Sequence, residues 1–350
     1  MSSLQWLSAI HARGLFHDLG PFLYFRYLAI LSALTAFCYP QQGARWRVKR
    51  LKLFCRSAFR FAAVRAWLQA VDSCALMRRV AVARPGLLER PYRPLGVFGL
   101  GFRQRMGTLL DHYRTLNALV PMAFSERVHV DGGLSCAFGE GRYALRLADA
   151  GPNPKEGELA FYWQDTASGT CLSQLSFYLR QGKDGVEIFV GGLQGPMGED
   201  SRDLIRASTK ACEGLRPKDA VMEALLGFAA ALGVRRVVGV SRQNHVGRQR
   251  HTPREILCDY EGFWRESGGE PLACGNVGMP VGQPRRDVME LPSRKRAAYR
   301  RKQALADGIQ AAVQGWLAAP EGVPAAMPEG PAQVRMPTVV SAGHVQPLAA

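Results

Sequence analysis

Apolar and polar residues alternate between residues 137 and 193, and this period of two limits most strongly what the chain can fold into. Tyr143, Leu145 and Leu147 occupy every second position of the first segment. Further segments of the same kind, separated by turns with Gly or Asp, lie at residues 158–163, 172–179 and 186–193. Because strands that follow one another through short turns usually pair with each other, the pattern predicts an antiparallel meander.

Helical patterns flank this meander on both sides. From residue 45 to about residue 120 the apolar residues recur at helical spacing. After the meander we predict helices at residues 200–212, 217–232, 254–265 and 294–317, and strands at residues 235–241 and 277–280. A strand that returns after a helix can pair in parallel, so mixed pairing is expected. The predicted fold class is α/β, with an N-terminal helical region packed on a mixed, largely antiparallel sheet.

Three regions follow from these patterns. Residues 1–120 are predicted to form a basic helical region, and residues 121–317 an α/β domain that carries the sequence motifs. Residues 318–350 consist largely of Ala, Pro, Gly and Val with few charges. Such a composition cannot build a core, so this tail is predicted to be disordered.

The net charge of +16 is concentrated in two segments. Residues 41–114 contain 16 Lys or Arg and 3 Asp or Glu, and residues 285–302 contain 8 and 2. Basic segments of this kind favour an anionic partner, which can be nucleic acid, acidic lipid, lipopolysaccharide phosphate or an acidic carrier protein. Arg outnumbers Lys by 37 to 8, a bias that a GC-rich genome also produces. Solvated basic helix faces are therefore the alternative interpretation.

Cysteine spacing and hydropathy bear on location. The eight cysteines are scattered, with no C-x-x-C pair and no histidine at zinc-finger spacing, so no metal site is predicted and a reducing compartment is favoured. The apolar run from Tyr27 to Tyr39 is shorter than the 20 or so residues that cross a bilayer. It is interpreted as a buried helix, with an interfacial membrane contact as the alternative. The predicted location is cytoplasmic or peripheral to the inner membrane, without a transmembrane segment.

The junction from Gly191 to Lys218 is the first candidate ligand site. A predicted strand leads through G-G-L-Q-G into two helices, and Pro217 suits the first turn of the second helix. Backbone amides at a helix N-terminus and nearby cations can hold an anion. The predicted ligand-binding residues here are Gln194, Gly195, Arg216 and Lys218. A tight turn with solvated charges explains the same residues.

The helix before that junction offers a second group of anion-binding candidates. Thr209 and Lys210 lie one helical turn from Arg206, so a hydroxyl and two cations share a face that can bind phosphate. Charged side chains on a solvated helix account for this spacing equally well.

Two residues are candidates for proton transfer. His245 follows the strand predicted at residues 235–241, and ligand sites in α/β sheets are often built at such strand ends. Glu156 belongs to K-E-G-E with Glu158; on a strand, residues two apart lie on one face and can bind an amine or act as a base. A surface-loop histidine and a solvated pair of carboxylates are the alternatives.

Aromatic residues follow in the next predicted helix. Tyr260 and Trp264 can form a wall for an acyl chain or a base. Packing of the same aromatic face into the core is the alternative.

Five motifs occur in one order and carry a family resemblance. They are K-E-G-E at residues 155–158, L-S-F at 175–177, G-G-L-Q-G at 191–195, T-K-A-C-E-G-L-R-P-K at 209–218 and Y-E-G-F-W-R-E-S-G-G at 260–269. In these motifs the chain resembles the VirK/YbjX family of proteobacterial proteins, over roughly residues 45–305. The resemblance implies an association with virulence, envelope integrity and resistance to antimicrobial peptides, and it implies no particular molecular activity.

The order of meander, glycine-containing exit, helix and further strand also resembles the core of a GNAT-type N-acetyltransferase. In that fold the cofactor pyrophosphate lies against loop amides and a helix N-terminus, which implies acyl-coenzyme A or an acyl carrier protein as donor here. The chain departs from that pattern, because about twenty residues separate the strand end from the stronger helix and a Q-x-x-G-x-G/A motif is absent. The leading hypothesis, taken from the family resemblance, is a protein that supports envelope stress resistance and virulence, with acyl transfer from an anionic donor as its candidate mechanism. The alternative is a non-enzymatic protein that binds RNA, acidic lipid or an acidic partner.

Overall fold

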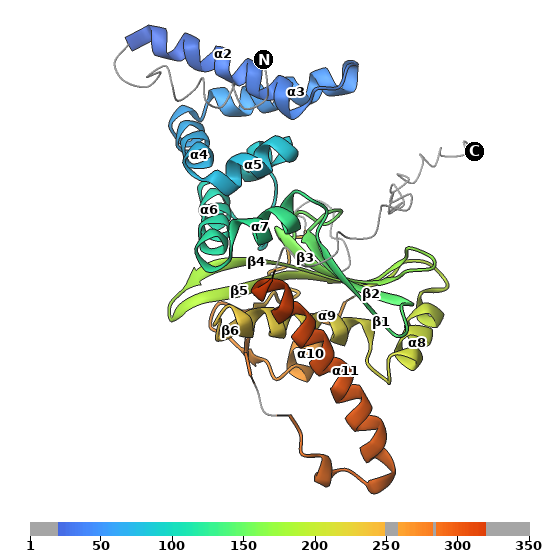
Figure 1. Ribbon diagram of the computed structural model, residues 1–350. Helices are drawn as coiled ribbons and strands as arrows, with labels where there is room; N and C mark the ends of the chain where they lie inside the picture. Colours follow the sequence, from blue (N-terminus) through green and yellow to red (C-terminus); the bar gives the residue numbers. More distant parts are fainter. Residues whose placement is uncertain (1–19, 249–257, 283–284, 320–350) are drawn as a thin grey trace, which may run out of the picture.

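The computed structural model describes residues 20–248, 258–282 and 285–319, and within them eight strands form one sheet (Figure 1). The strand order is β1-β2-β3-β4-β5-β6-β8-β7. The first five strands are β1 (Leu134–Phe138), β2 (Tyr143–Asp149), β3 (Leu159–Asp165), β4 (Cys171–Gly182) and β5 (Gly185–Gln194). Each pairs antiparallel with the next, which confirms the predicted meander. Strand β1 was not predicted, because only five residues carry it and three of its side chains are half-buried.

The remaining strands make the sheet mixed. They are β6 (Arg236–Gly239), β7 (Glu270–Pro271) and β8 (Val277–Pro280). Strand β6 pairs in parallel with β5, Glu187 to Val190 against Arg236 to Gly239, and antiparallel with β8. The predicted fold class, a mixed and largely antiparallel sheet with an N-terminal helical region, is therefore confirmed.

Helices cover both faces of the sheet. In the view of Figure 1, the N-terminal helices lie above the sheet and the C-terminal helices below it. The upper group comprises α2 (Gly20–Cys38), α3 (Ala44–Ala58), α4 (Phe61–Ser73), α5 (Ala75–Ala83), the 3₁₀ helix η1 (Pro85–Tyr92), α6 (Phe102–Leu119) and α7 (Met122–His129). The lower group comprises α8 (Ser201–Ala211), α9 (Pro217–Ala231), α10 (Tyr260–Glu266), the 3₁₀ helix η2 (Val288–Glu290) and α11 (Ser293–Ala318).

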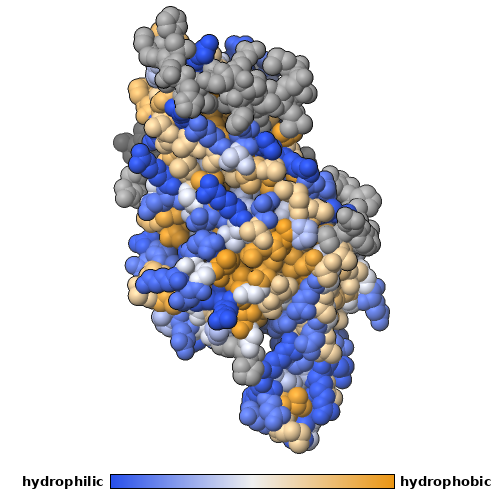
Figure 2. Space-filling model, turned by 60° about the vertical axis from the view of Figure 1, so that its left-hand side comes forward, coloured by the Kyte–Doolittle hydropathy of each residue, from blue (hydrophilic) through white to orange (hydrophobic). Residues whose placement is uncertain are grey.

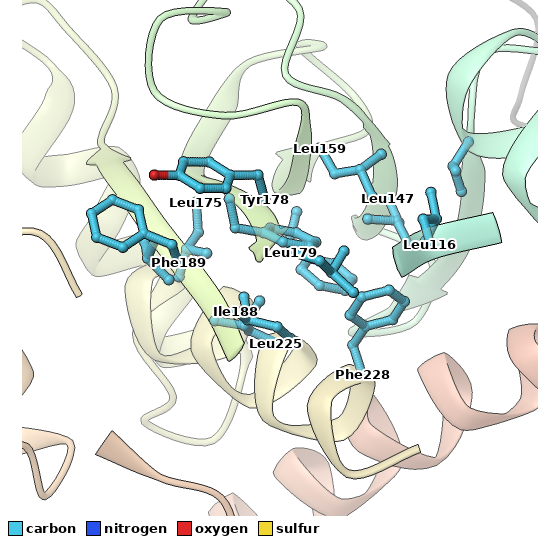
Figure 3. Close-up of a cluster of buried hydrophobic side chains, with 14 of the residues drawn as sticks. Leu116, Leu147, Leu159, Leu175, Tyr178, Leu179, Ile188, Phe189, Leu225 and Phe228 are labelled. Carbon is cyan, nitrogen blue, oxygen red and sulfur yellow. The ribbon is translucent and has the colours of Figure 1, made fainter. Parts of the chain in front are cut away.

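The core is continuous from the N-terminal helices to the last helix. One cluster of buried apolar side chains includes Leu31 of α2, Trp67 of α4, residues of every strand from β1 to β6 and Trp316 of α11. Figure 3 shows Leu225 and Phe228 of α9 pointing toward the sheet, and the Phe228 ring lies 5.7 Å from the ring of Phe177. The division predicted at residue 120 falls between α6 and α7, and side chains from both parts share this cluster. That division remains a prediction.

Several predicted helices are present with nearly the predicted bounds. Helix α9 begins at Pro217 and is followed by Gly233, whose φ of 67° ends the helix in the conformation that glycine favours. The apolar run at residues 27–39 lies in α2 with Tyr27, Leu31 and Leu34 buried, as predicted. No helix of the described part is long and apolar enough to cross a membrane.

The helix predicted at residues 254–265 begins later than expected. Helix α10 starts at Tyr260, because the Asp259 side chain accepts a hydrogen bond from the Gly262 amide and caps it. Residues 254–257 lie outside the described part, as do residues 320–350, on which most of the predicted disordered tail falls.

Candidate functional site

The two parallel strands at the centre of the sheet part at one end. Strand β5 continues to Gln194, whereas its pairing with β6 ends at Val190. In place of a strand, the Tyr260 hydroxyl accepts a hydrogen bond from the Leu193 amide at 3.2 Å and donates toward the Leu193 carbonyl at 3.5 Å. A side chain therefore takes backbone groups that a strand partner would otherwise hold.

Helix α10 is fixed against β6, which holds Tyr260 in place. The Trp264 indole donates to the Val240 carbonyl at 2.8 Å, and the ring lies directly over Gly239, where a Cβ atom would collide with it. Trp264 is completely buried. Its place is thus in the core, whereas Tyr260 reaches the strand end.

His245 follows β6 in the chain and lies beside Tyr260. The His245 Nε2 atom is 3.2 Å from the Tyr260 hydroxyl, and the two rings stack at 5.1 Å. The Nδ1 atom accepts a hydrogen bond from the Gly247 amide, so in the neutral ring the proton lies on Nε2. Burial lowers the His245 pKa to about 4, which keeps the ring neutral near pH 7. In this form His245 is a proton donor at Nε2.

Glu156 completes the cluster from the other side of β5. Its Oε1 atom accepts a hydrogen bond from the Gln194 side chain at 2.8 Å and lies 3.6 Å from His245 Nε2. Its Oε2 atom is buried without a hydrogen-bond partner among the described residues. Burial raises the Glu156 pKa to about 7, although the Gln194 hydrogen bond and the Lys155 charge act in the opposite direction. Near neutral pH this carboxyl can either accept or donate a proton.

The prediction that Glu156 and Glu158 share one face does not hold. Residues 151–158 form a turn before β3, so the alternation of a strand does not apply to them. Glu156 points toward Gln194, while Glu158 accepts hydrogen bonds from Arg90 and from the Tyr113 hydroxyl at 2.9 Å. The two carboxylates therefore belong to different sites.

Arg90 holds this turn in shape. Its Nε atom donates to Glu158 Oε1 at 3.0 Å, and its NH2 group donates to the same oxygen and to the carbonyls of Pro154 and Gly157. Burial is the largest influence on the Glu158 pKa and raises it, but the charges of Arg90 and His112 and the hydrogen bonds from Arg90 and Tyr113 together lower it below its ordinary value. The buried pair thus fixes the backbone from which the Glu156 side chain extends.

A pocket of about 370 Å³ lies next to the same turn. Its lining includes Arg84, Arg90 and Tyr113 from the helices and Lys155, Gly157 and Glu158 from the turn. None of the predicted catalytic or ligand-binding residues lines it. Glu156 therefore belongs to the cluster with His245 and Tyr260, whereas Lys155, Gly157 and Glu158 of the same turn line the pocket.

Arg216 and Lys218 form their contacts with residues outside the cluster of Glu156, His245 and Tyr260. Arg216 donates to Asp219 and Glu266 at 2.9 Å, and Lys218 donates to Glu266 at 3.3 Å and lies over the Phe263 ring. These contacts tie the start of α9 to the end of α10. An anion bound here would compete with carboxylates that already neutralise the two cations.

The second group of anion-binding candidates lies on α8. Arg206 pairs with Asp203 at 2.9 Å, and the Thr209 hydroxyl donates to the Ile205 carbonyl of its own helix. Lys210 is exposed. Gly195 follows Gln194 at the surface with no heavy atom near the place of a Cβ. The structure thus brings together Glu156, Gln194, His245 and Tyr260 of the predicted residues.

Two contributors were missed in the sequence. Arg90 lies 68 residues before Glu158 in the chain, and no local pattern links the two. The Leu193 backbone was missed because its contact with Tyr260, in place of a strand, depends on where the pairing of β5 with β6 ends. In the sequence, this part of the site was indicated only by K-E-G-E and by the glycines of G-G-L-Q-G. In the structure, Gly191 and Gly192 lie against Glu156.

The Glu156 carboxyl makes stability depend on pH in a defined direction. Its pKa is about 7 in the folded protein and lower in the unfolded chain, so the unfolded chain ionises first as pH rises. Stability from this group is present below about pH 4.5 and is lost as pH rises to 7, at about 1.4 kcal/mol per pKa unit. We expect Glu156→Gln to remove this loss, so that its stability relative to the unsubstituted protein rises by on the order of 3 kcal/mol between pH 5 and pH 8.

Urea unfolding at several pH values measures the effect. Glu199→Gln, which changes an exposed glutamate, is the matched control and should follow the unsubstituted protein. Parallel profiles for the Glu156→Gln variant and the unsubstituted protein would show that Glu156 ionises in its ordinary range.

Comparisons with known proteins agree with the sequence motifs. Residues 42–315 match the model of a family described as a protein of unknown function, DUF535. The chain is 30% identical to the uncharacterized protein YbjX of Escherichia coli K12 over 80% of this chain and 87% of that one. It is 25% identical to an uncharacterized protein of Haemophilus influenzae over 49% of this chain and 56% of that one.

Among solved structures, a cAMP-binding acyltransferase from Mycobacterium smegmatis matches with a TM-score of 0.26 and 12% identity. The match covers 61% of this chain and 61% of that chain. A score of this size supports no conclusion about the present chain.

Proposed function

The chain belongs to the VirK/YbjX family, described as DUF535, and we propose that it is an acyltransferase-like enzyme that uses an acyl thioester as donor. The observation that carries the proposal is the parting of parallel strands β5 and β6 beside Glu156, His245 and Tyr260. A proton acceptor, a proton donor and a backbone amide lie together at this point. Transfer of an acyl group to an amine or hydroxyl needs these three groups.

The proposed reaction assigns one task to each group. The acceptor nitrogen or oxygen attacks the thioester carbonyl carbon, and the Glu156 carboxylate takes the acceptor proton. The Leu193 amide, once released by Tyr260, stabilises the negative charge on the carbonyl oxygen. The new C–N or C–O bond remains, the C–S bond breaks, and the Tyr260 hydroxyl gives its proton to the departing thiolate.

His245 assists the return to the starting state in this scheme. Its Nε2 atom lies within 3.6 Å of both the Glu156 carboxyl and the Tyr260 oxygen. From Nε2 the neutral ring donates a hydrogen bond that stabilises the tyrosinate until the proton held by Glu156 returns to the Tyr260 oxygen. Burial raises the Tyr260 pKa, so the phenolate is unstable and this return is favoured.

The proposed donor is an anion, which is the kind of partner that the basic segments of the sequence predict. Acyl-coenzyme A or an acyl carrier protein supplies both an acyl thioester and phosphate. In the proposal Arg216 and Lys218 exchange their contacts with Glu266 for the donor phosphate. A role in envelope stress resistance and virulence is the part of the proposal that the family resemblance supports, and a cytoplasmic location is supported by the scattered cysteines.

Thermal unfolding with acetyl-coenzyme A and a long-chain acyl-coenzyme A tests donor binding. We expect a saturable rise in Tm, because a ligand that binds only the folded state stabilises it. Arg216→Ala should reduce this rise. Glu156→Gln and Tyr260→Phe should keep it but slow thiol release from the donor by about 10²-fold or more.

Two controls make the outcome decisive. Arg206→Ala changes an exposed arginine of α8. Its effect on the Tm rise, compared with that of Arg216→Ala, shows which of the two candidate groups binds the donor. The same variants, returned to a strain that lacks the protein, show whether survival of antimicrobial peptides follows thiol release. No Tm shift with either donor, or equal thiol release by all variants, would contradict the proposal.

A further inference from the structure

Helix α3 presents an exposed face that mixes apolar and basic side chains. Val48, Leu51 and Phe59 are 50%, 61% and 88% exposed, and Cys55 is exposed between them. These four positions are three, four and four residues apart, so they form one stripe along the helix and the residue that follows it. Large apolar side chains that are exposed in a continuous stripe indicate an interaction surface.

Cations border this stripe. Exposed basic residues flank it on one side at positions Arg45, Lys52 and Arg56, and on the other at Arg47. The sequence contains no Asp or Glu between residues 41 and 71. No carboxylate of α3, nor of residues 61–71 in α4, therefore balances the positive charge of this face.

The opposite side of α3 is already occupied. Leu53 and Ser57 are buried, and the Tyr27 hydroxyl of α2 donates to the Ser57 carbonyl at 2.7 Å. The helix is thus held in the fold by one side, and its mixed face is directed away from α2. Below the grey atoms at the top of Figure 2, hydrophobic and hydrophilic residues lie next to one another on the surface of the molecule.

We propose that this face of α3 docks the protein on the surface of an anionic lipid bilayer. Apolar side chains in a stripe enter the boundary between headgroups and acyl chains, and flanking Lys and Arg attract anionic lipids. Both kinds of residue are present here in the expected places. A nucleic acid would use the cations alone, because phosphate contacts do not require an exposed Leu, Val and Phe in one line.

The proposal does not depend on the reaction at Glu156. It also differs from a membrane-spanning segment, since no described helix can cross a bilayer. A docked α3 would place a cytoplasmic protein at the inner surface of the membrane.

Vesicle sedimentation tests the proposal with defined lipids. The full chain is expected to bind vesicles that contain phosphatidylglycerol and to bind poorly to vesicles of phosphatidylcholine alone. Leu51→Glu with Phe59→Glu should weaken binding to the anionic vesicles roughly tenfold or more, because two apolar side chains leave the bilayer and two negative charges replace them. Lys52→Gln with Arg56→Gln should also weaken it.

A matched control places the same charges elsewhere. Met197 and Met289 are 71% and 63% exposed and lie outside α3, so Met197→Glu with Met289→Glu adds two carboxylates without touching this face. This variant should lose far less binding than the α3 variant. Circular dichroism and Tm confirm that each variant is folded.

Three results would overturn the proposal. The first is failure of the folded, unsubstituted protein to bind anionic vesicles. The second is equal loss of binding in the α3 variant and the methionine control. The third is vesicle binding that falls in the Lys52 and Arg56 variant but not in the Leu51 and Phe59 variant. An RNA oligonucleotide measured in parallel identifies nucleic acid as the partner if it alone binds with dependence on the cations.

Discussion

Replacing Arg90 with methionine is expected to lower the free energy of unfolding by about 3–5 kcal/mol. The loss has this size because Glu158 would remain buried and ionised without its partner, and the carbonyls of Pro154 and Gly157 would lose a donor. Both side chains of the pair are about nine-tenths buried. Equilibrium unfolding in urea measures the change.

The same substitution at the surface provides the control. Arg206 and Asp203 also form an ion pair, but both side chains are more than three-quarters exposed, so Arg206→Met should change stability by less than about 1 kcal/mol. Adding Glu158→Gln to Arg90→Met should recover part of the loss, because the unpaired charge is removed. Equal effects of the two methionine variants would show that the Arg90 pair is no stronger than a surface pair.

Acid should weaken this pair in a direction opposite to that at Glu156. The Glu158 pKa is lowered in the folded protein, so its contribution to stability is present above the pKa of the unfolded chain. The contribution is lost as pH falls through the folded pKa. Glu156 loses its contribution as pH rises, so two glutamates of one motif act at opposite ends of the pH range.

Most of the sheet was predictable because its signals are local. The alternation at residues 143–147 and the turns that follow predict the strands and their antiparallel pairing. The proline at position 217 predicts the start of helix α9. Parallel pairing of β5 with β6 could be expected from the helices between them. These features depend on residues close in sequence.

The candidate site was predictable only in part, because its contacts join residues that are 15 to 89 positions apart in the chain. His245 and Tyr260 were singled out by position after a strand and by aromatic spacing, and both reach the site. Arg216 and Lys218 were expected to remain available to an anion, but Glu266 of α10 pairs with both. No pattern within 209–218 could reveal that distant carboxylate.

The turn that carries Glu156 packs closely against the G-G-L-Q-G motif of β5, which lies far from it in the sequence. A Cβ atom on Gly191 would lie 2.9 Å from the carbonyl carbon of Glu156 and closer still to its oxygen. The glycines of G-G-L-Q-G therefore allow the K-E-G-E turn to approach β5 closely, and the same motif forms the end of that strand. The two motifs are complementary parts of one contact.

Gly191→Ala is accordingly expected to lower the free energy of unfolding by about 1–3 kcal/mol or more, because overpacking must displace either β5 or the Glu156 backbone. The displacement should also change the pH dependence that Glu156 confers. Gly195→Ala, in the same motif, is the matched control. No heavy atom lies within 4 Å of a Cβ placed there, so stability should be unchanged or rise by a few tenths of a kcal/mol.

The comparison of the two glycines decides whether the contact between the motifs is structural. Urea unfolding gives the stability of each variant, and its dependence on pH shows whether Glu156 still ionises near 7. If Gly191→Ala is as stable as Gly195→Ala, the close approach at Gly191 does not constrain β5. If it is less stable but keeps the unaltered pH profile, the glycine supports the strand without positioning Glu156, and the carboxyl must be held by Gln194 and Arg90 instead.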